Sequence, residues 1–210
     1  MPNSPIQLAV LISGGGTTLQ NLVDRIGDGS LNARIAAVIA SRPGIKGIQR
    51  AKDAGLACHV VERGKYSSDA QFSRDVFKIC RDARAELVCL AGWLWLLEIP
   101  AEIQGRMMNI HPALLPSFGG YGMYGRRVHQ AVIDHGCKVS GCTVHFVDPA
   151  YDTGPIILQR TCPVLEDDTA DSLAKRVFEE EMIAYPEAIR LFQAGRLKIE
   201  GRRVRIEPPD

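Results

Sequence analysis

The stretch QLAVLISGGGTTLQ, residues 7–20, decides the fold. Residues 7–12 are mostly apolar, which predicts a buried strand, and three glycines stand among the next four residues. Beyond them apolar side chains recur at helical spacing, at Leu19, Leu22, Val23 and Ile26. A strand that runs through a glycine-rich turn into a helix predicts the first unit of an α/β domain.

The rest of the first half repeats this alternation. Residues 34–41, 57–61, 87–91 and 107–110 form apolar runs that predict further strands. Residues 48–54 predict a short helix, and Ser67 or Ser68 can cap a longer one. Strands that alternate with helices predict a parallel sheet with helices on its faces.

After Pro116 the pattern changes. The elements predicted there are a short helix at 128–135, strands at 141–147 and 156–164, a long helix at 172–194, and a hairpin of 197–200 with 203–206. We therefore expect an α/β fold with a Rossmann-like, mostly parallel sheet flanked by helices and antiparallel strands added in the C-terminal half. One domain is expected over residues 1–210, with a mononucleotide-binding front lobe of about 1–110 and a rear lobe of about 111–210.

The bulk composition narrows the class of protein. The 210 residues are 46% hydrophobic and carry 25 basic against 24 acidic side chains, so the charge gives no support to a nucleic-acid partner. None of the six cysteines forms a CxxC pair, which favours reduced thiols in the cytosol. The first residues are polar, and no apolar run reaches the roughly 20 residues of a membrane span. We expect a cytoplasmic protein.

The first candidate site is the glycine-rich turn. Free amides at the start of a helix, with the helix dipole behind them, favour an anion. Leu19 stands where a dinucleotide fingerprint needs glycine, and the Gly-Lys-Ser/Thr of a Walker loop is absent. The turn thus fits the phosphate of a small metabolite, bound by Gly14, Gly15, Gly16, Thr17 and Thr18; the alternative is a tight turn without a ligand.

The second candidate is Asn109-Ile110-His111-Pro112, at the end of a predicted strand. Strand alternation puts Asn109 and His111 on one side, where an amide and an imidazole suit an oxyanion. Asp152, in the loop between the two rear strands, would raise the imidazole pKa and keep His111 protonated. The alternatives are a structural His-Pro turn and a local turn role for Asp152.

Residues 91–97 (AGWLWLL) hold both tryptophans and are able to form a wall for a flat heteroaromatic ring, or simply part of the core. The sequence has no GxSxG elbow and no zinc-ligand spacing of histidine with cysteine, so neither a covalent nucleophile nor a metal site is expected.

Together these segments resemble the phosphoribosylglycinamide formyltransferase family of the formyltransferase superfamily. The resemblance covers nearly the whole chain and rests on the segments LISGGGTTLQNL, LAGWLWLL, MNIHPALLPSF, GCTVHFVDPAYDTGPIILQ and EEEMIAYPEAIRLFQAGRLKI. It implies transfer of the formyl group of 10-formyltetrahydrofolate to the amine of 5'-phosphoribosylglycinamide, in purine (IMP) biosynthesis. It also implies small-molecule substrates, no metal, no nucleic-acid or membrane partner, and a monomer or homodimer.

The resemblance also assigns roles. It implies the catalytic residues Asn109, His111 and Asp152, a phosphate site at Gly14–Thr18, and a contact of Glu181 with the ribose of the substrate. The folate-binding residues that it implies are Leu94, Trp95, Leu96, Leu97, Asn109, Asp148 and Asp152.

The chain departs from the family at several positions. Thr18 replaces a frequent asparagine, and Asp69 and Trp95 stand where relatives often carry arginine, so no residue is assigned to the folate tail. The segment 119–127 is longer than in some relatives, and we expect a flexible cover in which Arg126 or Arg127 approaches an anion.

Rival functions stay open. Methionyl-tRNA formyltransferase adds a C-terminal domain and formyltetrahydrofolate hydrolase an N-terminal one, and we expect neither in a chain of this length. From other classes, an NADP-binding oxidoreductase would use Arg42 for the 2′-phosphate, although Leu19 breaks its fingerprint. A non-catalytic sensor of a phosphorylated metabolite would bind without turnover.

Overall fold

The computed structural model describes residues 4–209, and the chain divides into two compact units between Met108 and Asn109. The elements of the first unit, in chain order, are β1 (Ile6–Ile12), α1 (Thr17–Gly27), β2 (Ala33–Ala40), α2 (Lys46–Asp53), β3 (Cys58–Val60), the 3₁₀ turn η1 (Arg63–Lys65), α3 (Asp69–Asp82), β4 (Leu87–Leu90) and the 3₁₀ turn η2 (Ala101–Ile103). Strand β5 (Met107–His111) carries the chain into the second unit.

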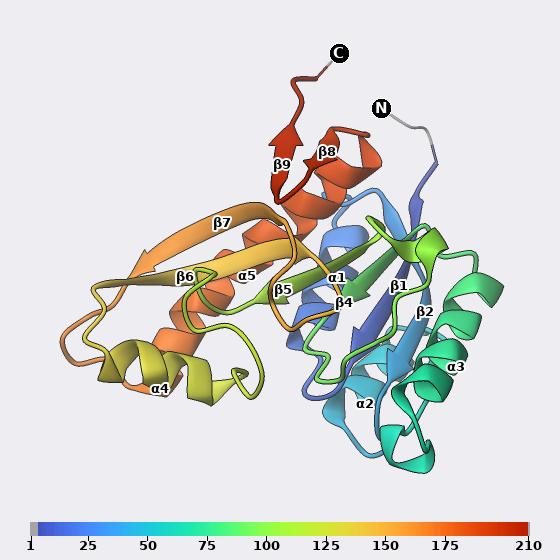
Figure 1. Cartoon of the computed structure of the whole chain (residues 1–210), viewed down its shortest axis with the longest axis horizontal. Helices are drawn as coiled ribbons and strands as arrows, with labels where there is room; N and C mark the ends of the chain where they lie inside the picture. Colours follow the sequence, from blue (N-terminus) through green and yellow to red (C-terminus); the bar gives the residue numbers. More distant parts are fainter. Residues whose placement is uncertain (1–3, 210) are drawn as a thin grey trace. The chain divides into compact units, whose positions relative to one another are not determined.

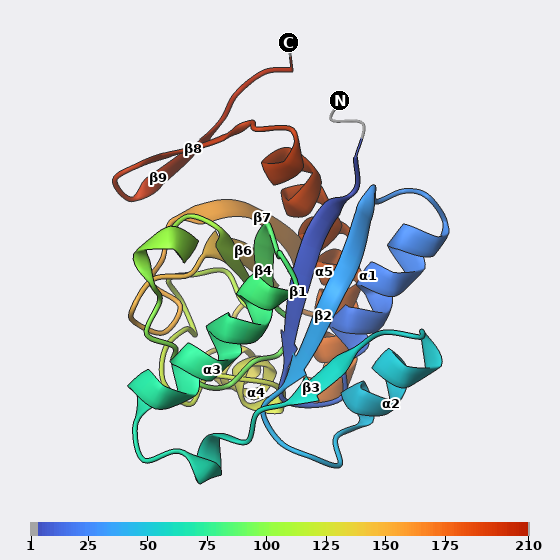
Figure 2. The same cartoon turned by 90° about the vertical axis from the view of Figure 1, so that its right-hand side faces the viewer.

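The strands of the first unit pair in parallel in the order β3-β2-β1-β4 (Figure 1). Figure 2 shows α1 and α2 on one side of β1 and β2, and α3 on the other. A parallel sheet covered on both faces needs apolar strands throughout, and β1 and β4 are almost entirely buried. In this unit the apolar runs therefore specify both faces of the sheet.

The second unit continues with α4 (Arg126–Asp134), β6 (Val139–Phe146), β7 (Ile156–Pro163), α5 (Ala170–Gln193), β8 (Leu197–Glu200) and β9 (Arg203–Ile206). Its strands lie in the order β5-β6-β7-β9-β8, with β6 antiparallel to β7 and β8 antiparallel to β9. Helix α5 packs on β6 and β7 (Figure 1). The predicted fold class, a mostly parallel α/β sheet with antiparallel strands in the C-terminal half, is confirmed.

Element bounds differ from the predicted ones by at most two residues. Helix α5 begins at Ala170 because Thr169 accepts a hydrogen bond from the amide of Ser172, whose hydroxyl in turn accepts one from the amide of Thr169. Val23 and Ile26, expected on the buried face of α1, are only partly buried, whereas Leu19 and Leu22 are fully buried. Among the described residues no helix combines the length and apolar character needed to cross a membrane.

Candidate functional site

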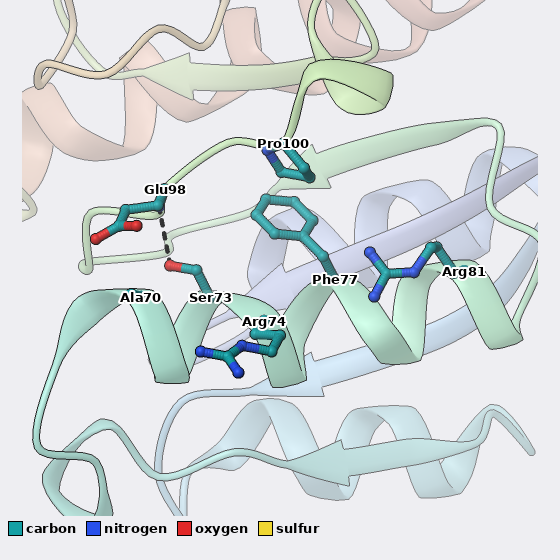
Figure 3. Close-up of a pocket in the computed structure, with 7 residues that line it drawn as sticks. All are labelled: Ala70, Ser73, Arg74, Phe77, Arg81, Glu98 and Pro100. Atoms are coloured by element: carbon teal, nitrogen blue, oxygen red, sulfur yellow. Dashed lines mark hydrogen bonds between the residues drawn. The ribbon is translucent and has the colours of Figure 1, made fainter.

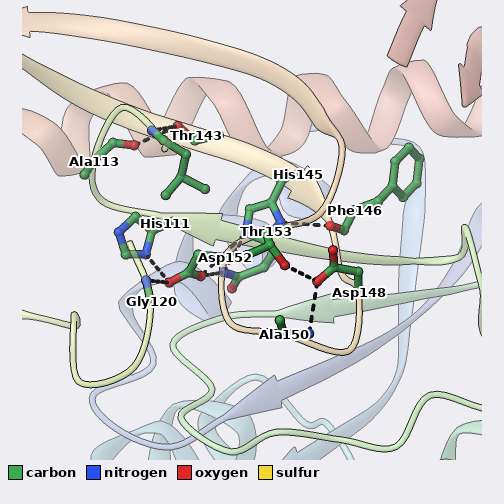
Figure 4. A network of polar contacts seen from close by, with 12 residues as sticks. His111, Ala113, Gly120, Thr143, His145, Phe146, Asp148, Ala150, Asp152 and Thr153 are labelled. Carbon is green, nitrogen blue, oxygen red and sulfur yellow. Dashed lines mark hydrogen bonds and ion pairs between the residues drawn. The ribbon is translucent and has the colours of Figure 1, made fainter. Parts of the chain in front are cut away.

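The second unit brings the three predicted catalytic side chains together around the carboxylate of Asp152. Figure 4 shows His111 beside this carboxylate. Asn109 and His111 lie two residues apart on β5, so strand alternation directs both side chains to one face. Asn109 Nδ2 donates to Asp152 Oδ1 at 3.3 Å, and His111 Nδ1 lies 3.4 Å from Asp152 Oδ2. These contacts place an amide, an imidazole and a carboxylate within reach of one reacting group.

The imidazole of His111 is 3% exposed, and its surroundings determine its charge. Nε2 lies 2.8 Å from the carbonyl oxygen of Phe118, which can only accept, so the ring carries a hydrogen on Nε2 and a lone pair on Nδ1 when neutral. Burial lowers the pKa of His111, and this effect outweighs the opposite influence of Asp152 and the Phe118 carbonyl. The expectation that Asp152 keeps His111 protonated is therefore wrong for the free protein. The loss of hydration destabilises the imidazolium more than the carboxylate of Asp152 stabilises it.

Asp152 is held as an anion. Burial alone would raise the pKa of Asp152, but the neighbouring side chains of His145 and His111 and the amide of Gly120 together lower it. The Gly120 amide donates to Oδ2 at 2.9 Å. Gly119 permits this approach, since a Cβ there would lie 2.5 Å from Leu115 Cδ2 and 3.2 Å from Asp152 Cβ.

Two residues of this cluster adopt left-handed backbone conformations that side-chain-bearing residues rarely use. Asp152 has φ 56° and Phe118 has φ 54°. Non-glycine residues rarely adopt this conformation. Those that do are found more often at functional sites, where surrounding contacts hold the backbone in place. The carboxylate and the carbonyl that face His111 are thus both fixed by unusual backbone geometry.

His145 is a member of the cluster that the sequence did not single out. It lies on β6, is 2% exposed, and places Nε2 3.2 Å from Asn109 Nδ2 and 3.7 Å from Asp152 Oδ1. Its only signal in the sequence is a histidine within the apolar strand TVHFV. With His145 present, both amide hydrogens of Asn109 have acceptors, His145 Nε2 and Asp152 Oδ1.

The glycine-rich turn of the first unit, predicted as a phosphate site, leaves its backbone amides open. Within the described chain, the amides of Gly14 to Thr18 donate to no protein acceptor. A Cβ at Gly14 or Gly15 would meet no protein atom within 4 Å, and neither residue has positive φ, so neither packing nor conformation requires glycine there. Gly16 differs, because its φ is 73° and its Cβ would lie 2.6 Å from Gly47 Cα. The open space above Gly14 and Gly15 leaves the amides accessible to a ligand.

Side chains behind this turn fix its shape. Arg50 Nε donates to the carbonyl oxygen of Gly15 at 3.0 Å, and Arg42 Nε donates to that of Ser13 at 3.0 Å. Arg42 is thereby engaged with the turn itself, next to the position where a phosphate would sit. These bonds engage the carbonyl oxygens of Ser13 and Gly15 with guanidinium groups.

The segment expected to contact the folate ring is divided between core and surface. Trp93 is buried and stacks on Phe72 at a ring distance of 5.7 Å, so this tryptophan belongs to the core of the first unit. Leu97 is also buried, whereas Leu94 and Leu96 are partly buried and Trp95 is 44% exposed. The amide of Leu94 donates to Ser13 Oγ at 3.1 Å, which ties this segment to the glycine-rich turn.

The remaining predicted residues lie in the second unit. Asp148 Oδ1 accepts from Thr153 Oγ1 at 2.6 Å and from the Ala150 amide at 3.1 Å, so its carboxylate organises the loop that carries Asp152 (Figure 4). Glu181, on α5, is partly buried, and burial raises its pKa to about 8. The Glu181 carboxyl is therefore mostly protonated at neutral pH.

Arg126 and Arg127, the first two residues of α4, contact other side chains of this protein. Arg126 Nε donates to Asp171 Oδ1 at 3.3 Å, and the Arg127 guanidinium lies 5.3 Å from the centre of the Tyr124 ring. Both contacts compete with the anion contact expected for these side chains.

A cavity of about 170 Å³ lies elsewhere in the first unit, against α3 (Figure 3). It is lined by Ala70, Ser73, Arg74, Phe77, Arg81, Glu98 and Pro100, none of which is a predicted site residue. Within residues 4–209 no group of three or more His, Cys, Asp or Glu side chains is arranged to hold a metal ion.

The chain belongs to the formyl transferase family, whose model matches residues 6–189. The predicted resemblance is confirmed by individual relatives. The chain is 37% identical to the chloroplastic phosphoribosylglycinamide formyltransferase of Arabidopsis thaliana, over 91% of this chain and 67% of that protein. Among solved structures it is similar to glycinamide ribonucleotide transformylase 1 from Symbiobacterium toebii, with a TM-score of 0.90 and 44% identity over 97% of this chain and 95% of that one.

A second group of relatives is much longer. The trifunctional purine biosynthetic protein adenosine-3 of Drosophila melanogaster is 39% identical over 90% of this chain, but the chain spans only 14% of that protein's length. The corresponding protein of Gallus gallus is 37% identical, and the chain spans 19% of it. The similarity to these proteins therefore concerns one part of each.

Proposed function

We propose that this chain transfers the formyl group of 10-formyltetrahydrofolate to the amine of 5'-phosphoribosylglycinamide, giving formylglycinamide ribonucleotide and tetrahydrofolate in IMP biosynthesis. The observation that carries the proposal is the cluster of Asn109, His111 and Asp152 in a chain of the formyl transferase family. The relatives named phosphoribosylglycinamide formyltransferase support the choice of acceptor.

The proposed chemistry follows from the hydrogen positions. The amine attacks the formyl carbon, a C–N bond forms, and the carbonyl oxygen becomes an oxyanion. His111 Nδ1, which has a lone pair and faces Asp152 at 3.4 Å, accepts the proton that the attacking nitrogen loses. The resulting imidazolium is stabilised by Asp152 and donates a proton to the folate nitrogen as the C–N bond to it breaks. Before that collapse, an N–H of Asn109 and the imidazolium stabilise the oxyanion, whose electrons reform the carbonyl as the folate nitrogen leaves.

The binding roles belong to the same proposal. The amides of Gly14, Gly15, Gly16, Thr17 and Thr18 hold the substrate phosphate, and Glu181, as a neutral acid, donates to a ribose hydroxyl. Leu94, Trp95, Leu96 and Leu97 contact the folate ring, with Asn109, Asp148 and Asp152. The two units act as front and rear lobes of a single formyltransferase domain.

Glycine substitutions test the phosphate site. Gly15→Ala adds a methyl group into open space, so we expect the melting temperature to stay within about 2 °C and the KM for the ribonucleotide to rise at least tenfold. Gly64→Ala is the matched control, because a Cβ there also meets nothing within 4 Å, and it should change neither value. An unchanged KM in Gly15→Ala would refute the phosphate site.

Hydrolysis is the rival reaction within the fold. The chain is similar to a formyltetrahydrofolate deformylase from Pseudomonas syringae, with a TM-score of 0.86 but 20% identity, which concerns the fold alone. The decisive assay follows tetrahydrofolate formation with and without 5'-phosphoribosylglycinamide. Product that requires the acceptor supports transfer, and product without it means hydrolysis.

We also propose that the enzyme works in the cytoplasm on small molecules alone, without nucleic acid or membrane, as a monomer or homodimer. The balanced charge supports the absence of a polyanionic partner. Sedimentation of the purified chain, with and without tRNA, tests the oligomeric state and the absence of a nucleic-acid partner. A complex with tRNA or an assembly larger than a dimer would contradict them.

A further inference from the structure

The tautomer of His145 is fixed by its own strand. Nδ1 lies 2.8 Å from the carbonyl oxygen of Phe146, and the side chain is 2% exposed. A carbonyl oxygen only accepts hydrogen bonds, so the hydrogen of the neutral ring is on Nδ1. Nε2 of His145 is therefore an acceptor, and it faces Asn109.

Two acceptors determine which way the Asn109 amide faces. His145 Nε2 lies 3.2 Å from Asn109 Nδ2, and Asp152 Oδ1 lies 3.3 Å from the same nitrogen. If the amide turned over, its oxygen would face a lone pair and a carboxylate oxygen, both of which repel it. The nitrogen is thus the atom that faces Asp152.

The two acceptors differ during the reaction. Asp152 lies beside His111, which gains and loses a proton in the proposed reaction. The negative charge of Asp152 is therefore partly neutralised when the imidazolium forms. His145 is held by the Phe146 carbonyl 2.8 Å away and takes no part in that transfer. Its lone pair is the constraint on Asn109 that persists while the oxyanion is present.

We propose that His145 is a positioning residue for Asn109. Its Nε2 keeps the amide nitrogen turned toward the reacting carbonyl, so that the N–H shared with Asp152 Oδ1 passes to the oxyanion. Without this acceptor the amide can rotate and direct its oxygen at the oxyanion. The inference rests on the proposed formyl transfer, and it adds a fourth side chain to the cluster around Asp152.

Two substitutions separate positioning from packing. In His145→Gln the side-chain oxygen takes the place of Nε2 and keeps the acceptor for Asn109, whereas His145→Asn keeps a donor for the Phe146 carbonyl but loses that acceptor. Both replace the imidazole with an amide, so we expect similar falls in melting temperature. We expect kcat to fall 10–100-fold in His145→Asn, with both KM values within threefold of wild type, and to stay within fivefold of wild type in His145→Gln.

If kcat falls equally in the two variants, the positioning role is overturned. Formyl transfer itself still stands in that case, provided that the wild type is active. A wild type that makes no formylated product would overturn formyl transfer itself, and the positioning role with it. Two-bond ¹H–¹⁵N spectra of the free protein, assigned with the His145→Gln variant, test the premise without turnover. We expect these spectra to show the hydrogen of His145 on Nδ1. A hydrogen on Nε2 would overturn the inference, whatever the kinetics of the variants.

Discussion

Replacing Glu181 with glutamine should change how the stability of the protein depends on pH. The folded pKa of about 8, against an ordinary value of 4.5, means that the folded chain keeps a proton that the unfolded chain releases over this interval. Because the pKa is raised on folding, the contribution of Glu181 to stability is complete below about pH 4.5 and is lost as the pH rises toward 8. Glutamine is neutral throughout and lacks this loss.

The size of the effect follows from the pKa difference. One pKa unit corresponds to about 1.4 kcal/mol. The free energy of unfolding of Glu181→Gln, relative to that of wild type, should therefore increase by about 3 kcal/mol between about pH 5 and pH 8. Urea unfolding of both proteins at the two pH values measures it, and Glu179→Gln, an exposed position on the same helix, controls for the lost charge. Because glutamine resembles a protonated carboxyl, the KM for the ribonucleotide should rise less than in Glu181→Ala. A stability difference that does not change with pH would show that Glu181 is ionised in the folded chain and refute the reasoning.

Further predictions concern the cluster around Asp152. His111→Ala and Asn109→Ala should each lower kcat by about 10²–10³ because each removes a group that stabilises the oxyanion; steady-state assays that find near-normal rates would exclude these roles. Asp152→Asn should lower kcat by about 10² or more, since the imidazolium loses its counter-charge; an active variant would mean that the carboxylate is structural. In the free protein, an NMR titration of the His111 ring should give a pKa below 6.5 and a still lower pKa in Asp152→Asn, because burial lowers the value and Asp152 raises it. A pKa above 6.5 in the wild type would contradict the dominant role of burial.

The sequence predicted the fold well where local patterns determine it. The terminal hairpin of 197–200 with 203–206 was located to the residue, because Gly201 marks the turn between two short runs. Ser68 was one of two capping residues named for α3, and its side chain accepts from the Gln71 amide. Helix starts were less certain, since the start of α5 depends on reciprocal bonds between Thr169 and Ser172.

The site was predicted only in part, for physical reasons. Alternation along one strand was enough to pair Asn109 with His111. Asp152 was named from its loop as a carboxylate partner of His111, with a local turn role as the alternative, and the resemblance then implied that it is catalytic. The charge of His111 could not be read in this way, because burial depends on every segment that packs around it. His145 was missed because its role depends on β6 lying beside β5 in the sheet and on a hydrogen bond to the next residue in its own strand.

The left-handed backbone at Asp152 couples stability to activity at a single position. Its φ of 56° is one that glycine adopts freely, whereas a side chain there costs roughly 1 kcal/mol. Asp152→Gly should therefore relax the loop while removing the carboxylate that the proposed reaction uses. Stability-directed engineering that favours glycine at strained turns would thus inactivate the enzyme, and the free energy held in this turn is part of what keeps the carboxylate ready before any substrate arrives.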